Sequence, residues 1–187
     1  GGDFAEVFAQ KDHATRIHLI SGKIDAVGDQ IIAGMGIRVF LGTQTYYAST
    51  SDLSREGMLR CAADVAGAVG QEKPQTVRPL AERSVKNIHP VRKNPGDVPV
   101  GEKADVLRMA AEAARAESDK IVQATGNYLD NDRSVLIANS EGLFVTDRKV
   151  RTRLALFAIA SEGGENQSGF YGPGGGVGFE LFETVDP

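Results

Sequence analysis

The pattern of apolar and polar positions divides the chain into strand-like and helix-like stretches. Alternation with a period of two indicates strands at 4–10 and 15–21, and Gly22 ends the second of them. Residues 31–49 predict a hairpin whose turn begins at Gly42. The first fifty residues are therefore expected to form antiparallel strands.

A helix is predicted at about 54–69 because capping signals frame it. Ser54 is a favourable N-cap, and Gly70 follows the last turn, where glycine is favoured. One face of this helix is apolar and is expected to be buried. Its members are Met58, Ala62, Val65, Ala66 and Val69.

A second helix is predicted at about 102–117, which is rich in strong helix formers. We expect its buried stripe to contain Val106, Leu107, Ala110, Ala113 and Ala114. The pattern then returns to strands separated by turn-forming clusters. The strands are expected at 120–129, 133–139, 143–150, 151–160 and 167–171, with turns at 130–132, 140–142 and 163–164.

Five of the seven prolines fall in residues 71–100. Each proline fixes φ and removes a backbone donor, so this stretch is predicted to be a semi-rigid linker. The prediction is an α+β fold of two subdomains, each an antiparallel sheet with a packed helix. They are an N-terminal subdomain at 1–70 and a middle helix with a β-meander at 101–187, joined by the linker at 71–100.

Composition narrows the classes of function. The net charge of −4 and pI near 5.4 argue against a nucleic-acid partner, because nucleic-acid binders are usually basic. The single cysteine, Cys61, excludes an internal disulfide and favours a reducing compartment, so we expect the cytoplasm. No apolar run approaches the ~18 residues that a membrane span needs. The chain starts at Gly1 without a methionine, and we expect it to be part of a longer protein.

No group of residues has the spacing of a metal or catalytic site. Zinc needs three or four converging ligands, but His13 and His18 are placed on opposite faces of a strand and His89 lies in the linker. The Asp-Asn-Asp cluster at 130–132 lacks the glycine and glutamate of a calcium loop and is predicted to be a hairpin turn. Cys61 is expected to be buried and inert. We therefore predict no catalytic residue, metal ligand or cofactor within this chain.

The stretch at 172–178 is dense in glycine and admits three interpretations. It is a plain loop between strands, a loop whose bare backbone lies close to a peptide or a partner subunit, or a phosphate-binding loop. The third fits poorly, because no Gly-x-Gly-x-x-Gly spacing and no Lys-Ser/Thr pair are present. The candidate contact residues are Gly174, Gly175, Gly176 and Gly178.

A short basic run lies at Lys149, Arg151 and Arg153. In an extended strand these three side chains share one face, while those at 150, 152 and 154 point the other way. Such a stripe is either a solvated sheet face or a patch that contacts an acidic partner.

Taken in order, several motifs resemble the TldD/PmbA family, which is described both as zinc-dependent peptidases and as modulators of DNA gyrase. The similarity covers nearly the whole chain and rests on the order and spacing of the motifs. They are residues 2–8, Gly36-Ile37-Arg38-Val39, Tyr47-Ala48-Ser49, the helix start at Leu53-Ser54, Glu102 to Leu107, Ala138-Asn139-Ser140-Glu141-Gly142 and residues 174–180.

The resemblance implies that the zinc motif, His-Glu-x-x-x-His, and a later cysteine ligand follow the segment that ends here. This chain would then be the front of a zinc metallopeptidase acting on peptides or unfolded proteins. It would supply cavity wall, peptide guidance and contacts in a homo- or heterodimer with a family member. The alternative is a non-catalytic partner subunit of the TldE/PmbA branch, or a protein-binding module linked to gyrase modulation. Zinc is implied for the full-length protein only in the TldD branch.

Overall fold

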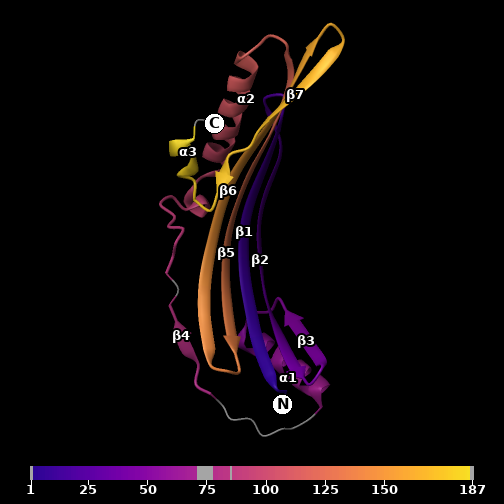
Figure 1. Cartoon of the computed structure of the whole chain (residues 1–187), viewed down its shortest axis with the longest axis vertical. Helices are drawn as coiled ribbons and strands as arrows, with labels where there is room; N and C mark the ends of the chain where they lie inside the picture. The colour runs from indigo at the N-terminus through magenta and orange to yellow at the C-terminus, as the bar shows by residue number, and fades with distance from the viewer. Residues whose placement is uncertain (1, 71–77, 85, 186–187) are drawn as a thin grey trace. The chain divides into compact units, whose positions relative to one another are not determined.

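The structure is a computed structural model that describes residues 2–70, 78–84 and 86–185. Its strands form one sheet in the order β3-β2-β1-β5-β6-β4, with β7 and β8 also paired to β6 (Figure 1). The strands are β1 (Phe4–Ile20), β2 (Lys23–Leu41), β3 (Gln44–Thr50), β4 (Ala81–Arg83), β5 (Ile121–Asn139), β6 (Leu143–Glu162), β7 (Glu165–Tyr171) and β8 (Gly174–Gly175). The helices are α1 (Arg55–Val69), α2 (Val100–Ala116) and α3 (Leu181–Thr184), with a 3-10 turn at η1 (Pro95–Asp97).

These elements confirm the predicted α+β class. The β2–β3, β6–β7 and β6–β8 pairings are antiparallel, whereas the short β4 pairs with β6 in parallel. None of the helices formed by the described residues is long and apolar enough to span a bilayer. Part of the predicted linker, residues 71–77 and 85, lies outside the described residues, and the rest of it contains β4 and η1.

Contacts group the chain into two units that interleave in sequence. The first contains Gly1–Asp12, Ile31–Asn87 and Arg133–Arg148, and the second contains His13–Gln30, Ile88–Asp132 and Lys149–Pro187. The long strands β1, β2, β5 and β6 each contribute to both units. The predicted division into 1–70, 71–100 and 101–187 is a division into continuous stretches of sequence. The grouping by contacts does not test it, so it stays a prediction.

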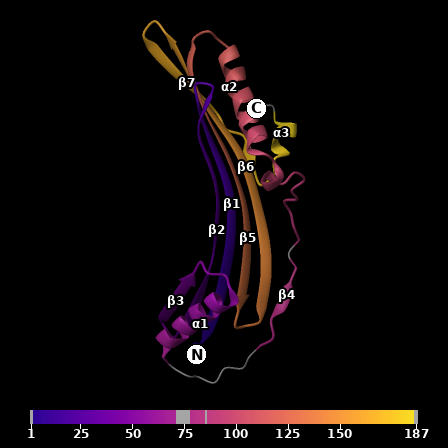
Figure 2. The same cartoon turned by 180° about the vertical axis from the view of Figure 1, so that it is seen from behind.

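In the first unit, α1 packs against β3 and the neighbouring part of β2 (Figure 2). The predicted caps are confirmed: the Ser54 hydroxyl accepts a hydrogen bond from the Gly57 amide at 3.1 Å, and Gly70 has φ +64°. The predicted apolar face is only partly right, because Met58 is 38% exposed. The buried positions recur every fourth residue at Gly57, Cys61, Val65 and Val69.

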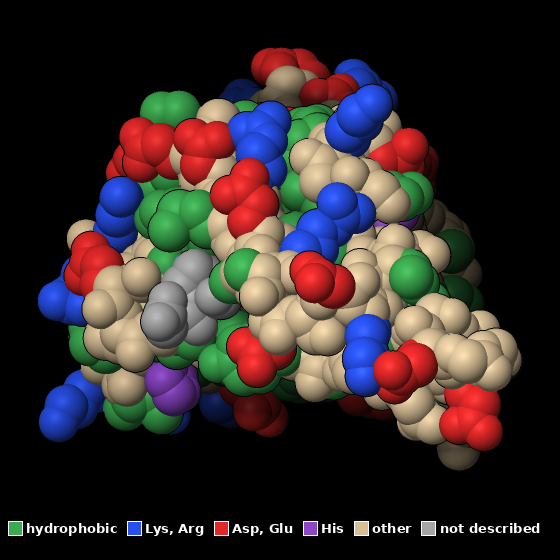
Figure 3. Space-filling view, turned by 90° about the horizontal axis from the view of Figure 1, so that it is seen from above, with side chains coloured by type: hydrophobic (Ala, Val, Ile, Leu, Met, Phe, Trp, Pro, Cys, Tyr) green, Lys and Arg blue, Asp and Glu red, His purple; other side chains and the backbone are tan. Residues whose placement is uncertain are grey.

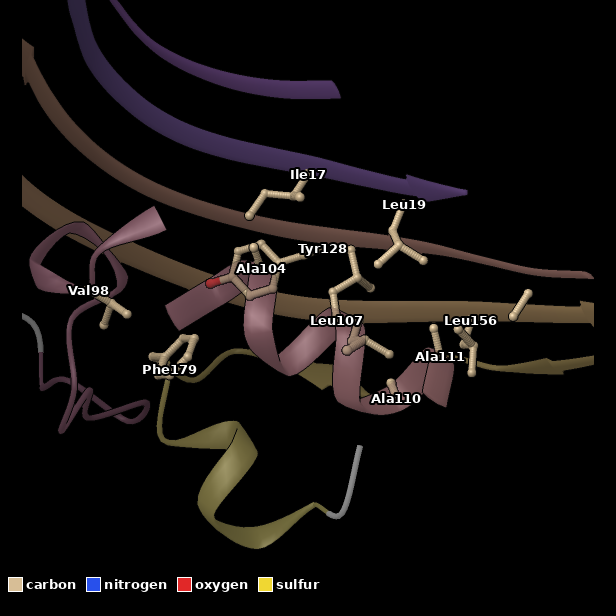
Figure 4. Packing of buried hydrophobic residues seen from close by; sticks show 12 residues of the cluster. Ile17, Leu19, Val98, Ala104, Leu107, Ala110, Ala111, Tyr128, Leu156 and Phe179 are labelled. Carbon is tan, nitrogen blue, oxygen red and sulfur yellow. The ribbon is translucent and has the colours of Figure 1, made fainter. Parts of the chain in front are cut away.

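In the second unit, α2 covers strands β1, β5 and β6, and its start differs from the prediction by two residues. Figure 4 shows Leu107 and its neighbours directed toward strand residues such as Ile17 and Leu156. Gly126 lies under the helix, where a Cβ atom would come within 2.6 Å of Leu107 Cδ1. The predicted stripe is largely right: Leu107 and Ala110 are buried, and Val106 and Ala114 are partly buried against the same core. The fully buried residues of α2 are Lys103, Ala104, Leu107, Ala110 and Ala111.

The structure joins strands that the sequence pattern separated. The predicted turn at 130–132 is wrong, because β5 runs through it and the Asp130 side chain is buried. Burying this carboxylate alone would be costly, and an ion pair with Lys103 of α2 compensates it. The predicted turns at 140–142 and 163–164 are confirmed, and Gly142, Gly163 and Gly164 have positive φ.

Candidate functional site

The glycine-rich segment is built into the sheet of the second unit. β8 pairs with β6, with Gly175 opposite Thr152 and Gly174 opposite Arg153. A Cβ atom at Gly174 would lie 3.0 Å from the Cβ of Arg153, so the missing side chain permits this close pairing. Two of the four predicted contact glycines, Gly174 and Gly175, are therefore paired through their backbone with β6, the strand that carries Lys149, Arg151 and Arg153.

The other two glycines face the segment that precedes α2. Gly176 lies against the imidazole of His89, and a Cβ atom at this position would be 3.7 Å from the ring. At Gly178 a Cβ atom would collide with the carbonyl oxygen of Lys93 and the carboxylate of Glu180. Internal packing therefore explains the glycine at 178, and a contact with a peptide or partner stays a prediction for all four positions.

Glu180 holds the glycine-rich segment against residues 92–93. The sequence gave no reason to name it as a candidate functional residue. Its buried carboxylate accepts hydrogen bonds from the backbone amides of Arg92 at 3.0 Å and Lys93 at 2.9 Å. Burial alone raises the pKa of Glu180, but the backbone donors, led by these two amides, outweigh it and leave the pKa below its usual value. The ionised carboxylate ties the C-terminal segment to residues 92–93.

The basic strand has the two faces that its sequence predicts. Lys149, Arg151 and Arg153 are exposed, and the side chains at 150, 152 and 154 are buried. In the view of Figure 3, acidic and basic side chains are interspersed with apolar ones, and no large area of one sign stands out on that face. Whether the stripe contacts an acidic partner stays a prediction.

A buried ionic cluster joins α2 to the sheet of the second unit. Lys103 Nζ lies 2.7 Å from Asp130 Oδ2 and donates to Thr15 Oγ1 at 2.9 Å. The Tyr128 hydroxyl donates to Asp130 Oδ2 at 2.7 Å. Burial, followed by the charge of Asp130 and this hydrogen bond, raises the pKa of Tyr128. Every buried side-chain nitrogen and oxygen in the described part of the chain has a partner. The closed, fully paired cluster is suited to holding α2 in place rather than to binding a substrate.

A hollow of about 420 Å³ lies in the first unit, where β3 ends. The β2–β3 pairing runs from Leu41 to Met35, and the hollow extends from the last paired residues, among them Gly36 and Ser49, to Ile32. Phe8, Ile32 and Tyr47 line it and are 44%, 59% and 61% exposed. The sequence pattern gave no indication of it, because the hollow depends on where one strand stops along another.

A second concavity in the first unit has a volume of about 520 Å³. Three consecutive residues from each of three neighbouring strands line it. They are Ala9, Gln10 and Lys11 of β1, Ser134, Val135 and Leu136 of β5, and Thr146, Asp147 and Arg148 of β6. Leu53 and Asn87 also line it. This site was not predicted either.

The described residues do not contain a donor set for zinc. No group of three or more His, Cys, Asp or Glu side chains among them could hold a metal ion. His13 Nε2 lies 2.6 Å from Asp29 Oδ1, and His18 Nδ1 lies 3.1 Å from Asp25 Oδ2, as two separate pairs. We therefore derive no metal-dependent step from these residues.

Two family models match the chain. The model for PmbA/TldA metallopeptidase domain 1 matches residues 5–69, and the model for the PmbA/TldA metallopeptidase central domain matches residues 93–186. The two matches occur in the order that their names imply and together leave only short parts of the chain unmatched.

Two curated relatives are metalloproteases. A metalloprotease of Methanothermobacter thermautotrophicus is 30% identical over 187 residues, which cover 98% of this chain and 40% of the relative. A metalloprotease TldD homologue of Buchnera aphidicola is 22% identical over 160 residues, covering 82% of this chain and 32% of the relative. The chain thus spans well under half the length of the relatives it matches.

Solved structures share the fold. A candidate modulator of a DNA gyrase from Thermotoga maritima has a TM-score of 0.76 and 20% identity, covering 93% of this chain and 40% of that one. TldE from Thermococcus kodakarensis has a TM-score of 0.68 and 15% identity, covering 94% of this chain and 40% of that one.

Proposed function

This chain belongs to the PmbA/TldD metallopeptidase family, and from that premise we propose that it is the front, non-catalytic part of a zinc-dependent peptidase acting on peptides or unfolded proteins. Its relatives are named metalloproteases and are more than twice as long as the part that it matches. The proposal places the zinc ligands in the remaining part of such a longer protein. It also places the protein in the cytoplasm, in a homo- or heterodimer with a family member.

The observation that carries the role of this chain is the open sheet edge beside the 420 Å³ hollow of the first unit. A strand edge binds an extended polypeptide through main-chain hydrogen bonds, which depend little on side-chain sequence. That mode suits a substrate defined by being unfolded rather than by a motif. In this proposal the chain contributes cavity wall, peptide guidance and subunit contacts, while the chemistry occurs elsewhere.

A second candidate function is that of a partner subunit without its own zinc, or of a protein-binding module linked to DNA gyrase. The similarity in fold to TldE and to a candidate gyrase modulator supports this second candidate function. The exposed stripe of Lys149, Arg151 and Arg153 is the local feature that an acidic protein partner would contact.

Expression of the whole reading frame that contains this chain distinguishes the two functions. We expect stoichiometric zinc and cleavage of an unfolded substrate such as reduced, alkylated casein. A chelator should abolish the cleavage, and added zinc should restore it. The 187-residue chain alone serves as the control and should show neither property.

Absence of zinc and of cleavage in the complete protein would contradict the peptidase proposal. If cleavage then appeared only after a second family member was added, the partner-subunit function would be supported instead.

A further inference from the structure

We propose that residues 31–34 of β2 form a strand-addition site for an extended, uncharged peptide, one side chain of which enters the hollow lined by Phe8, Ile32 and Tyr47. The inference rests on the proposed function in taking that peptide to be substrate. It goes beyond that function by naming the strand edge that binds the peptide, the hollow that receives one peptide side chain, and the uncharged nature of that side chain.

The first observation is an open main-chain edge. The pairing of β3 with β2 ends with Met35 opposite Thr50. In the strand order of the described residues, β2 has β1 on its other side and no further strand beyond β3. The segment 31–34 therefore continues β2 past the end of β3. A strand that is paired on one side presents backbone N–H and C=O groups on the other.

The second observation is that this edge lacks the usual protection. Natural sheets guard exposed edges with charges, prolines or bulges, because an open apolar edge recruits other chains. From Gln30 to Gly36 the sequence has no charge and no proline. Ile31 and Ile32 are 61% and 59% exposed, and neighbouring residues of a strand point to opposite faces. This part of β2 is therefore apolar on both faces.

The rest of the same edge looks different. Between Lys23 and Asp29, β2 carries charges at Lys23, Asp25 and Asp29. The outermost strand, β3, is seven residues long and reads Gln-Thr-Tyr-Tyr-Ala-Ser-Thr. The charges of residues 23–29 and the short, mostly polar sequence of β3 both discourage pairing with a further chain. The unprotected stretch is confined to the part of β2 that borders the hollow.

The third observation is the hollow itself. With a volume of about 420 Å³, it is a shallow hollow that opens widely to solvent and has room for a side chain. No charged residue is among those that line it. Met35 is buried against α1, so Ile32, Gly34 and Gly36 lie on the opposite sheet face, where the Tyr47 ring lies over Gly36 and the carbonyl oxygen of Thr50 borders Gly34. An apolar or small polar side chain fits this lining, and a charged one would lose its hydration without a partner.

The small size of the site favours a peptide over a second copy of the chain. Four residues of strand extend about 13 Å, and stable protein interfaces bury roughly 1,200–2,000 Å². An edge of this length with one hollow provides little of that area. A short extended peptide needs only the main-chain bonds and one or two side-chain contacts.

The test uses the 187-residue chain and a fluorescent seven-residue peptide of alternating Val and Thr, followed by fluorescence anisotropy. Two control peptides carry N-methyl groups on the amides of one or the other set of alternate residues. Methylation of the set that faces β2 should weaken binding about tenfold or more, since each net hydrogen bond contributes roughly 0.5–1.5 kcal/mol. Methylation of the outward-facing set should leave binding within about twofold, because those amides face solvent.

Protein variants locate the site. Ile32→Lys puts a charge beside the edge and should weaken binding about tenfold, as edge lysines do in natural sheets. Leu59→Lys is the matched control, because Leu59 is 56% exposed on α1, and it should bind like the wild type. Circular dichroism establishes that both variants fold.

Three results would overturn the inference. Equal binding of both methylated peptides would exclude main-chain recognition, and normal binding by Ile32→Lys would place the peptide elsewhere. Self-association of the wild type that Ile32→Lys abolishes, without peptide binding, would make the edge an interface between copies. If the complete protein still showed zinc-dependent cleavage, any of these results would contradict only the peptide site at residues 31–34 and not the proposed function.

Discussion

Lys103 Nζ lies 2.7 Å from Asp130 Oδ2 in the core of the second unit, where the two side chains are 3% and 5% exposed. The pair joins α2 to the middle of β5, and Thr15 and Tyr128 supply further hydrogen bonds. Because both charges are desolvated, the pair matters most when one partner is removed. It specifies where α2 sits on these strands and explains why β5 continues through a cluster of polar residues.

The ion pair predicts a strong asymmetry between single and double variants. Lys103→Met should lower the free energy of unfolding by roughly 3–5 kcal/mol, because it leaves the Asp130 carboxylate buried without its countercharge. The double variant Lys103→Met/Asp130→Asn should recover part of that loss. Urea denaturation measures both, and a double variant no more stable than Lys103→Met would show that the charge itself is not responsible.

Glu180 predicts an acid-sensitive contribution to stability. Its pKa in the folded protein is below the ordinary value of 4.5, so the folded state favours the ionised form. The contribution is fully present above the unfolded pKa and is lost as the pH falls through the folded one. Glu180→Gln should therefore melt below the wild type at pH 7, and the difference in Tm should shrink toward pH 3. A difference in Tm that did not change with pH would contradict this role of the carboxylate.

The packing around Gly178 predicts that a larger residue there destabilises the protein, although a glycine-rich sequence suggests a loop that tolerates substitution. Gly178→Ala should destabilise the chain by about 1–3 kcal/mol, because the new methyl group would collide with the carbonyl oxygen of Lys93. Gly67→Ala is the matched control, since no atom lies within 4 Å of a Cβ at that position in α1. That change should be neutral or stabilising by up to roughly 1 kcal/mol. Thermal unfolding of the two variants compares them, and equal Tm values would refute the packing argument.

The basic stripe predicts an effect on binding without an effect on folding. Arg151→Glu/Arg153→Glu should change the free energy of unfolding by less than about 0.5 kcal/mol per site, because both side chains are exposed. If the stripe contacts acidic partners, the double variant should lose salt-sensitive binding of a polyglutamate peptide, measured by anisotropy. Binding equal to that of the wild type would make the stripe an ordinary solvated face.

Features encoded within a few residues were predictable from the sequence. The α1 caps at Ser54 and Gly70 and the turn at Gly42 depend on local backbone conformation and on hydrogen bonds to near neighbours. The alternation around Arg151 followed from the period of a strand. The order of short motifs along the chain was also sufficient to indicate the family.

Features that depend on distant residues required the tertiary structure. Asp130 has the local signature of a turn, and only Lys103, on another element, makes its burial in a strand favourable. Gly178 is constrained by Lys93 across the fold, and the open edge at 31–34 exists because β3 ends opposite Met35. Local sequence indicated the two long helices and many of the strand segments, because propensities and caps act over a few residues, but it did not show that β1, β5 and β6 continue past the predicted boundaries. Strand partners, buried charges and the candidate peptide site were decided by packing between segments far apart in the chain, which a single sequence does not specify.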